Sequence, residues 1–290
     1  SRPRRGHSAD AINAGQLRHS LLEMTGRTSD IAAPDWSMSD PEVAAVLDWW
    51  SAHARPLPWR AGRDAYAVWV SEVMSTQTTV SRAAEAWVRW MERWPTVDAL
   101  AAASLAEVLG QWQGLGYPRR ARDLHRSARI VAVSGWPDDL TALPGVGPYI
   151  AAAVRCFARE EPVLPVDVNV RRVLRRRFAG DIDISEDPWR AGQALMEFGQ
   201  RVCTARPRCG ACPVREGCAG PEAGDTGARG ARRQKPFEGS LRQRRGRLLR
   251  RVLEEGAVPV GERDAEVAAG LASDGLAALE AGWLRAPREG

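Results

Sequence analysis

Lysine is almost absent from this chain of 290 residues, because Lys235 is the only lysine among its 41 basic residues. A GC-rich genome alone can explain the surplus of arginine, although arginine forks also match phosphate geometry better than ammonium groups do. No stretch approaches the roughly 20 apolar residues that span a bilayer, and the first residues lack the apolar core of a signal peptide. We therefore expect neither a membrane-spanning helix nor a secreted protein.

The composition indicates a folded and basic protein, with 44% hydrophobic residues, 27% charged residues and a net charge of +5. The length allows one large domain or two modest ones. The positive charge favours an anionic partner, but nucleic acid, an acidic membrane surface and simple solubility are all compatible with it.

Apolar residues recur at helical spacing along most of the chain, and few windows alternate with a period of two, so the sequence predicts an all-α fold. The first helix should begin after Asp40, with Pro41 in its first turn, and residues 56–60 should interrupt the pattern. Further helices are predicted at 64–80, 81–94, 105–112, 121–134, 149–157, 170–178 and 189–202.

Composition divides the chain into four segments. Residues 1–38 form a predicted mobile arm rich in arginine, 39–220 the main helical domain, 221–238 a linker, and 239–290 a small basic unit. A basic helix at 240–255, two short helices and a strand at 283–285 predict that this last unit is winged-helix-like, and a solvated basic helix is the alternative.

The segment 143–149 (LPGVGPY) carries two glycines two residues apart, between predicted helices. Gly145 and Gly147 let the backbone turn tightly around Val146, so that free N–H groups and the N-terminus of the next helix can face a phosphate. This pattern is typical of a helix-hairpin-helix motif that binds DNA, and a plain turn between two helices is the alternative.

Two carboxylates stand in contrasting settings. Asp167 is placed as the N-cap of a helix, where dipole and N–H groups keep a carboxylate ionised, although a routine capping residue is the alternative. Glu72 interrupts an apolar run, which favours the protonated form of a carboxyl group and suits a proton donor, although an exposed helix position is the alternative. One proton donor and one ionised carboxylate are typical of glycosidic-bond cleavage.

Four of the five cysteines cluster in the pattern Cys203-x5-Cys209-x2-Cys212-x5-Cys218, whereas Cys156 stands alone in an apolar helical pattern and is predicted to be a core residue. Clustering favours a metal site over a disulfide framework. Zinc sites usually pair two short knuckles, and only one Cys-x2-Cys occurs here, so the four thiolates favour a [4Fe–4S] cluster, with zinc and free thiols as alternatives.

Together these motifs resemble the endonuclease III superfamily and, within it, the adenine DNA glycosylase (MutY) family, over roughly residues 43–220. The resemblance implies a six-helix barrel at about 65–165, a cluster module made of 39–64 and 166–220, and DNA in the cleft between them. The matching segments are 57–60 (LPWR), 71–74 (SEVM), 77–78 (QT), 114–117 (GLGY), 143–149 (LPGVGPY), 167–170 (DVNV) and 194–199 (ALMEFG).

The resemblance also implies roles for individual residues. Glu72 would protonate adenine and Asp167 would stabilise the sugar cation, with Tyr149 and Asn169 organising it. The residues that would line the pocket for the flipped adenine are Trp59, Arg60 and Glu197. Those that would fill or probe the duplex are Gln77, Thr78, Leu115, Gly116 and Tyr117, and those that would hold phosphate are Gly145, Val146 and Gly147. Core packing is the alternative for the aromatic and apolar side chains, and an ordinary surface position is the alternative for the polar ones.

Bifunctional members of this superfamily carry a hairpin lysine that attacks the sugar, whereas Tyr149 stands at that position here and Lys235 lies in the predicted linker. We therefore predict base removal without strand cleavage. The resemblance further implies a bacterial, cytoplasmic, nucleoid-associated monomer that binds double-stranded DNA in which adenine is mispaired with 8-oxoguanine or guanine.

Three features depart from the family pattern. Ser75 and Thr76 stand where the family usually has leucine and glutamine. Five residues separate Cys203 from Cys209, one fewer than is usual in the family. The tail of about 70 residues after Cys218 is short for a Nudix-like domain. Many relatives recognise 8-oxoguanine with that domain, so recognition should here come from the catalytic domain or the small unit, or be weaker. The competing hypotheses are a thymine or uracil glycosylase for G mismatches, a glycosylase with lyase activity, and a non-catalytic iron–sulfur DNA-binding protein.

Overall fold

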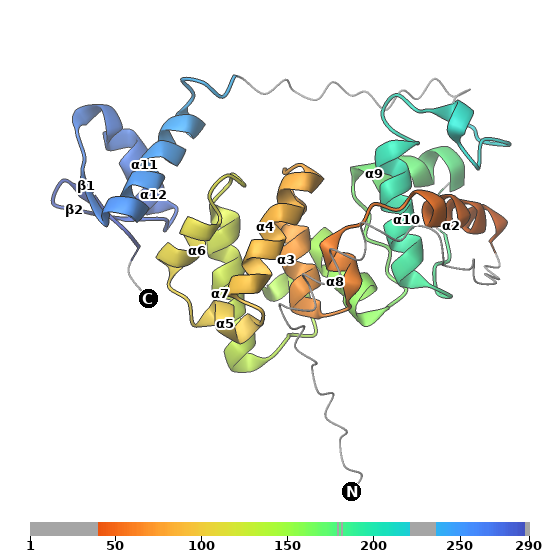
Figure 1. The fold of residues 1–290 in the computed structure, drawn as a ribbon, viewed down its shortest axis with the longest axis horizontal. Coiled ribbons are helices and arrows are strands. Elements are labelled where there is room, and N and C mark those ends of the chain that lie inside the picture. The colour runs from red at the N-terminus through yellow and green to blue at the C-terminus, as the bar shows by residue number, and fades with distance from the viewer. Residues whose placement is uncertain (1–39, 179, 181, 221–235, 288–290) are drawn as a thin grey trace, which may run out of the picture. The chain divides into compact units, whose positions relative to one another are not determined.

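The computed structural model describes residues 40–178, 180, 182–220 and 236–287, and the structural statements below concern these residues (Figure 1). The predicted arm and most of the predicted linker, with Lys235, lie outside them. The chain forms two compact units, one made of 70–146 and 236–287 and the other of 40–69 and 147–220. Helices dominate both units, as predicted. None of the described helices is long and apolar enough to cross a membrane.

The first unit has a core rich in tryptophan. Trp90 meets Trp94 and Trp112 edge-on, with ring centroids 4.7 and 5.6 Å apart. Ser104 and Glu107 form a capping box that starts one of the helices and thereby satisfies its first N–H groups. The helices of this part are α4 (Val80–Arg93), α5 (Val97–Ala101), α6 (Leu105–Gln111), α7 (Arg119–Ser134) and the short 3₁₀ helix η2 (Leu140–Ala142).

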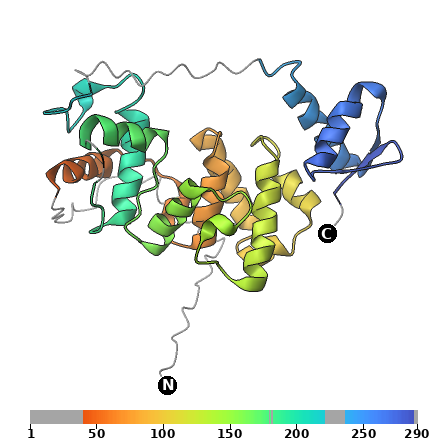
Figure 2. The ribbon, with the colours of Figure 1, turned by 180° about the vertical axis from the view of Figure 1, so that it is seen from behind.

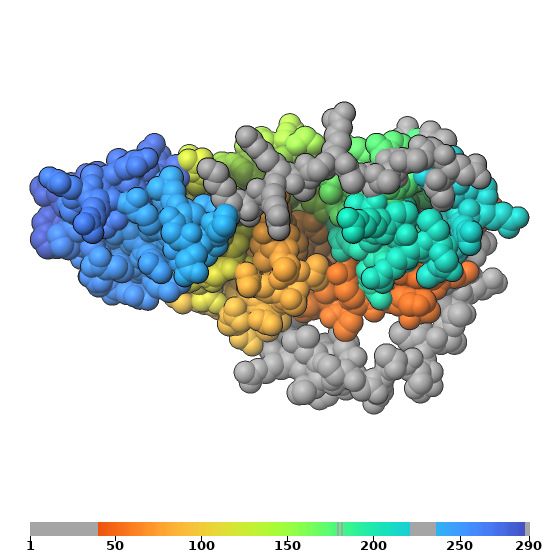
Figure 3. All heavy atoms as spheres, turned by 90° about the horizontal axis from the view of Figure 1, so that it is seen from above, coloured from red at the N-terminus to blue at the C-terminus, as the bar shows by residue number. Residues whose placement is uncertain are grey.

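Residues 236–287 of the first unit form a small body of two α-helices, the short 3₁₀ helix η5 (Glu262–Asp264) and a sheet (Figure 2), and their atoms form one compact blue group in Figure 3. The strands make an antiparallel sheet in the order β1-β3-β2. Leu248 and Leu284 are buried in this body. Asp274 joins it to α7, because its carboxylate accepts hydrogen bonds from Arg119 of α7 and Arg245 of α11. The elements are α11 (Leu241–Glu255), β1 (Ala257–Pro259), α12 (Ala265–Ser273), β2 (Ala278–Glu280) and β3 (Trp283–Arg285).

The second unit is organised around α10, which packs against α2, α8 and α9. Gly192 permits close packing there, since a Cβ at this position would lie 2.7 Å from the ring of Phe157. Cys156 is fully buried and its Sγ donates to the carbonyl of Pro188 at 3.0 Å, which confirms the predicted core position. The elements are α2 (Pro41–His53), the 3₁₀ helix η1 (Pro58–Ala61), α8 (Pro148–Arg159), α9 (Val168–Val173) and α10 (Pro188–Arg201).

Helix α3 (Ala65–Ser75) contributes to both units and ends before the predicted boundary at residue 80. Gln77 has a φ of +57°, a left-handed conformation that an α-helix cannot continue through. The predicted helix at 170–178 also divides, because α9 ends at Val173 and a π-helical turn covers Leu174–Phe178. The short α5 was not predicted, because five residues carry too little periodicity.

Candidate active site and DNA-contacting turns

Glu72 is buried in α3, with 7% of its surface exposed. Val73 and Met74 beside it are 5% and 0% exposed, and Ser71 is 1% exposed. The exposed position considered for Glu72 is therefore wrong, because the side chain is buried. A carboxyl group in a setting of this kind is suited to donate a proton.

Asp167 is the N-cap of α9, as predicted. Its Oδ1 accepts hydrogen bonds from the backbone N–H groups of Asn169 and Val170 at 2.8 and 2.7 Å, and its Oδ2 accepts one from Asn169 Nδ2 at 2.7 Å. Three donors thus hold both carboxylate oxygens in one orientation. Helix capping and a catalytic role do not compete here, because the cap itself orients the carboxylate.

Arg172 connects Asn169 to the cysteine segment, a link that the sequence did not predict. Its Nη2 donates to Asn169 Oδ1 at 2.8 Å and to the carbonyl of Gly199 at 2.7 Å, and its Nε donates to the carbonyl of Cys203 at 2.7 Å. The backbone of α10 comes very close to α9 here, since a Cβ on Gly199 would lie 2.9 Å from the carbonyl oxygen of Asn169. One guanidinium group therefore fixes Asn169 relative to the first cysteine.

The hairpin turn has the geometry that its sequence predicts. Pro144 and Gly145 occupy the central positions of a turn closed by a 3.1 Å hydrogen bond from the N–H of Val146, and the φ of +76° at Gly145 suits a type II turn. A Cβ on Gly145 would lie 2.9 Å from Asp123 Cβ. Gly147 is the N-cap of α8, whose first N–H groups have no partner within the helix. The hairpin can therefore present backbone N–H groups to an anion.

Tyr149 and Trp59 are both half-buried. Tyr149 stands in the first turn of α8, and its hydroxyl donates to Met196 Sδ at 3.9 Å. Trp59 belongs to η1, next to Arg60. The position at which lyases of the superfamily carry a lysine therefore holds a phenol, which supplies no amine.

Two turns of the first unit carry the residues predicted to probe the duplex. The turn between α3 and α4 holds Gln77 and Thr78, and the turn between α6 and α7 holds Leu115, Gly116 and Tyr117. Gln77 is exposed and Tyr117 is 49% exposed, whereas Leu115 is only 5% exposed. Leu115 thus packs in the core in this structure, and its contact with DNA stays a prediction that requires the turn to rearrange.

Glu197 lies beneath three arginines and a tryptophan in the second unit. Its side chain is 0% exposed. Its carboxylate accepts hydrogen bonds from Arg55 Nε at 2.8 Å, Arg60 Nη2 at 2.9 Å, Arg201 Nη1 at 3.1 Å and Trp50 Nε1 at 3.2 Å. Burial works against the charged form of Glu197, but the guanidinium groups of Arg60 and Arg55 outweigh it and hold the pKa below its usual value. The surface position considered for Glu197 is therefore wrong.

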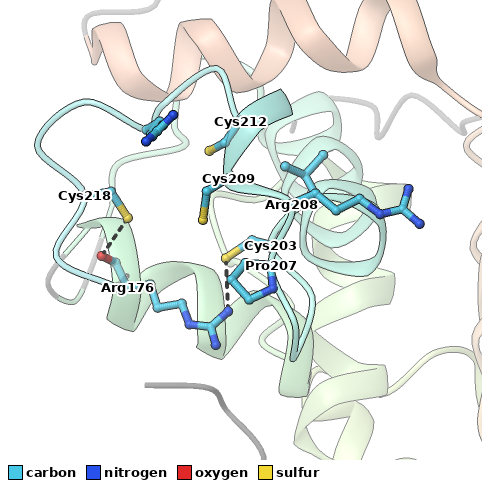
Figure 4. A pocket seen from close by; sticks show the side chains of 10 residues that line it. Arg176, Cys203, Pro207, Arg208, Cys209, Cys212 and Cys218 are labelled. Carbon is cyan, nitrogen blue, oxygen red and sulfur yellow. Dashed lines mark hydrogen bonds between the residues drawn. The ribbon is translucent and has the colours of Figure 1, made fainter. Parts of the chain in front are cut away.

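The four clustered cysteines line a single pocket (Figure 4). Arg176 is 4% exposed and lies on the wall of this pocket, where its Nη1 is 3.6 Å from Cys203 Sγ and its carbonyl oxygen is 3.4 Å from Cys218 Sγ. Burial and the charges of the other three thiols raise the pKa of Cys212. In residues 40–178, 180, 182–220 and 236–287, no group of three or more His, Cys, Asp or Glu side chains is arranged to hold a metal ion.

The donor set of this pocket fits a metal centre that is held by four thiolates. Around one zinc ion all sulfur atoms lie about 2.3 Å from the same centre, whereas in a [4Fe–4S] cluster each thiolate binds a different iron and the sulfur atoms lie farther apart. All four cysteines line this one pocket, and four thiolates are the donor set that either centre uses. The guanidinium of Arg176 adds a positive charge on the wall of the pocket, 3.6 Å from Cys203 Sγ.

Comparison with known proteins decides the family. Residues 70–197 match the HhH-GPD superfamily of base excision DNA repair proteins. The adenine DNA glycosylase of Mycobacterium tuberculosis is 42% identical over 265 residues, which are 81% of this chain and 86% of that protein. The adenine DNA glycosylase of Mycolicibacterium smegmatis is 43% identical over 246 residues, which are 77% of this chain and 83% of that protein.

The chain belongs to the adenine DNA glycosylase family. This membership makes it a DNA glycosylase of base excision repair, on the helix-hairpin-helix fold that the sequence predicted. The human adenine DNA glycosylase is 41% identical over 208 residues, which cover 60% of this chain but only 38% of the human protein. The similarity to the human enzyme is thus confined to part of that enzyme.

Solved structures show the same fold. A thermostable thymine-DNA glycosylase aligns with a TM-score of 0.56 and 26% identity, over 62% of this chain and 95% of that one. Endonuclease III from a non-covalent complex with DNA aligns with a TM-score of 0.52 and 21% identity, over 73% of this chain and 98% of that one. The glycosylase fold thus accounts for nearly all of these two proteins, while this chain has additional residues.

Proposed function

We propose that this adenine DNA glycosylase removes adenine that is mispaired with 8-oxoguanine or guanine in double-stranded DNA, without cutting the strand. The observation that carries the proposal is the retention of two carboxylates in complementary settings. Glu72 is buried in α3, and Asp167 is held by three hydrogen-bond donors.

The reaction breaks the N-glycosidic bond of an adenine that has left the base stack. In our proposal Glu72 donates a proton to the departing base, so that adenine leaves as a neutral molecule. Asp167 faces the positive charge that develops on the sugar, and Asn169 holds its carboxylate through the 2.7 Å hydrogen bond. Tyr149 contributes to the same organisation. Water then adds to the sugar, with Glu72 accepting a proton from it, and an abasic site remains.

The other predicted residues would bind the substrate. In our proposal Trp59 and Arg60 border the adenine pocket, and Glu197 lies behind Arg60 and holds it in place through their hydrogen bond. The two exposed turns described above would fill the gap left by the base, since inserted side chains replace lost stacking. The hairpin glycines would bind a DNA phosphate through backbone N–H groups. We expect the enzyme to act as a monomer in the bacterial cytoplasm, at the nucleoid.

Strand cleavage requires an amine that forms a Schiff base with the sugar. Tyr149 stands at the hairpin position that carries this amine in bifunctional relatives. Removal of the base without a covalent amine adduct is therefore the expected outcome.

We further propose that Cys203, Cys209, Cys212 and Cys218 hold a [4Fe–4S] cluster. The cluster would fold residues 203–218 into one fixed loop, because binding free energy of this kind is also folding free energy. Absorbance near 410 nm together with about four iron atoms per chain is the expected result, and stoichiometric zinc would contradict it.

A single-turnover assay tests the proposed reaction. The substrates are duplexes with adenine opposite 8-oxoguanine, adenine opposite guanine, thymine opposite guanine and uracil opposite guanine. We expect cleavage of the adenine duplexes after alkali treatment only, no borohydride-trapped adduct, and loss of activity in Glu72→Gln and Asp167→Asn. The absence of cleavage with both adenine duplexes would refute the proposal.

The second candidate is removal of thymine opposite guanine, because a thymine-DNA glycosylase shares the fold at 26% identity. The adenine enzymes from mycobacteria reach 42–43% identity and cover more of the chain, so we place this candidate second. The thymine and uracil duplexes of the same assay distinguish the two.

A further inference from the structure

Arg120 lies between the two turns that carry the predicted DNA probes. It belongs to the first turn of α7 and is half-buried, although arginine usually lies at the surface. Its guanidinium carbon lies 5.2 Å from the ring centroid of Trp112 and 5.7 Å from that of Tyr117. Two aromatic side chains therefore confine the guanidinium plane.

One end of this guanidinium binds the turn between α3 and α4. Its Nη1 donates to the carbonyl of Val73 at 2.7 Å and to that of Thr76. The carbonyl groups at the C-terminus of a helix lack helical partners, and a positive charge there is favourable. Arg120 thus caps α3 just before Gln77, at the point where the helix ends.

The other end binds the turn between α6 and α7. Its Nη2 donates to the carbonyl groups of Leu115 and Gly116 at 2.9 and 3.0 Å, and it lies 3.4 Å from the hydroxyl of Thr78. That hydroxyl in turn lies 3.4 Å from the carbonyl of Leu115. A single side chain therefore joins two turns that are about 40 residues apart in the sequence.

Both turns hold a conformation that their own residues disfavour. Gln77 and Tyr117 have φ values of +57° and +49°, in the left-handed region that side chains other than glycine rarely occupy. Such residues persist only where the surrounding structure holds them. The hydrogen bonds of Arg120 supply that restraint from inside both turns.

We propose that Arg120 is a positioning residue that holds these two turns in one shared geometry, so that both reach the mispair together. This inference rests on the proposed function for its meaning, since it concerns how the glycosylase examines DNA. Lysine cannot replace arginine here, because an ammonium group is a point charge and cannot extend one planar fork to both turns.

Amide hydrogen exchange in the free protein tests the positioning role without any reaction. The N–H groups of Thr78 and Leu115 are hydrogen-bonded within their turns and report on the two turns separately. Arg120→Lys should speed exchange in both turns, and Arg126→Lys, an exposed arginine on the same helix, should speed neither. Should Arg120→Lys fail to fold, Thr78→Val removes the hydroxyl that contacts Arg120 and the carbonyl groups of Leu115 and Thr76, and it should speed exchange in both turns to a smaller extent.

DNA binding and cleavage test the consequence. Arg120→Lys should lower the single-turnover rate on adenine opposite 8-oxoguanine by about 10- to 100-fold, the range seen for small misplacements of substrate-positioning groups. It should also weaken binding to this duplex while leaving binding to an undamaged duplex unchanged, because only the mispair engages the turns. Arg126→Lys should match the wild-type protein in both measurements.

These outcomes separate the positioning role from the proposed function. If the wild-type protein cleaves no duplex, the proposed function fails, and the exchange experiment still decides the role of Arg120. Faster exchange in only one turn, or an equal loss of affinity for mispaired and undamaged DNA, would overturn the inference.

Discussion

Replacement of Glu197 by glutamine should destabilise the second unit strongly, although the two side chains have nearly the same shape. The carboxylate is fully buried and accepts hydrogen bonds from Arg55, Arg60, Arg201 and Trp50. Arg60 itself has a side chain only 9% exposed, so it cannot turn to water when its partner loses the charge. The change therefore leaves a buried cation without its counter-charge.

The size of the effect follows from this geometry. Removal of one partner from a buried ion pair costs about 3–5 kcal/mol. Glutamine keeps one carbonyl oxygen that still accepts from Arg60, but its amide places N–H groups against the donors on the other side. We therefore expect about 3 kcal/mol, which is a large share of the roughly 5–15 kcal/mol by which a typical protein is stable.

Urea unfolding followed by tryptophan fluorescence measures this difference. With typical slopes of about 1–3 kcal/mol per M urea, a loss of about 3 kcal/mol lowers the midpoint by about 1–3 M urea. The control is Glu160→Gln, which removes a surface pair with Arg63 whose side chains are 59% and 41% exposed and which should cost less than about 1 kcal/mol. If Glu197→Gln unfolds at the same urea concentration as Glu160→Gln, the assignment of Glu197 as a buried ionic centre is wrong.

Three further results are expected. The pKa of Glu197 is held below its ordinary value of 4.5, so its carboxylate stabilises the folded protein fully above pH 4.5. This stabilisation is lost as the pH falls through the lowered pKa. The urea midpoints of the wild-type protein and Glu197→Gln should therefore converge in acid. Gly145→Ala should lower both the unfolding midpoint and the DNA affinity, because φ is +76° and a Cβ would meet Asp123. Gly147→Ala should lower them less, because a Cβ at Gly147 would have no atom within 4 Å. Equal effects of the two changes on DNA affinity would contradict the assigned turn geometry. Asp274→Asn weakens the contacts with Arg119 and Arg245. It should make residues 236–287 more sensitive to limited proteolysis while the iron content stays unchanged. Unchanged sensitivity would show that these contacts do not hold residues 236–287 in place.

Features that depend on neighbouring residues were predictable from the sequence. The cap at Asp167, the hairpin turn at Gly145 and the amphipathic helices all follow from interactions within about four residues along the chain. The cysteine spacing belongs to the same class, because four thiols in so short a segment are forced toward a common site. For such features the local sequence contains most of the relevant physical information.

Boundaries were less predictable where distant contacts override local preference. The end of α3 at Ser75 is one example, because Gln77 takes a left-handed conformation and Arg120 from another helix binds the carbonyl of the residue before it, Thr76. The burial of Leu115 was also hard to predict, because the flanking Gly114 and Gly116 indicate an exposed loop, whereas Leu115 is only 5% exposed. Tertiary contacts supply the free energy that local propensity lacks.

The scarcity of lysine and the presence of Tyr149 in the hairpin are determined by the sequence alone, and no fold can add an amine to that position. The sequence likewise contains both carboxylates, but only the tertiary structure decided that Glu72 is buried, because burial depends on which helices pack against α3. The same holds for Glu197 and Arg120, each of which has partners that lie far away in the sequence, such as Trp50 for Glu197 and Val73 for Arg120. Long-range contacts of this kind leave no periodicity in the chain, so the ionic centre and the clamp between the turns became visible only in the folded protein.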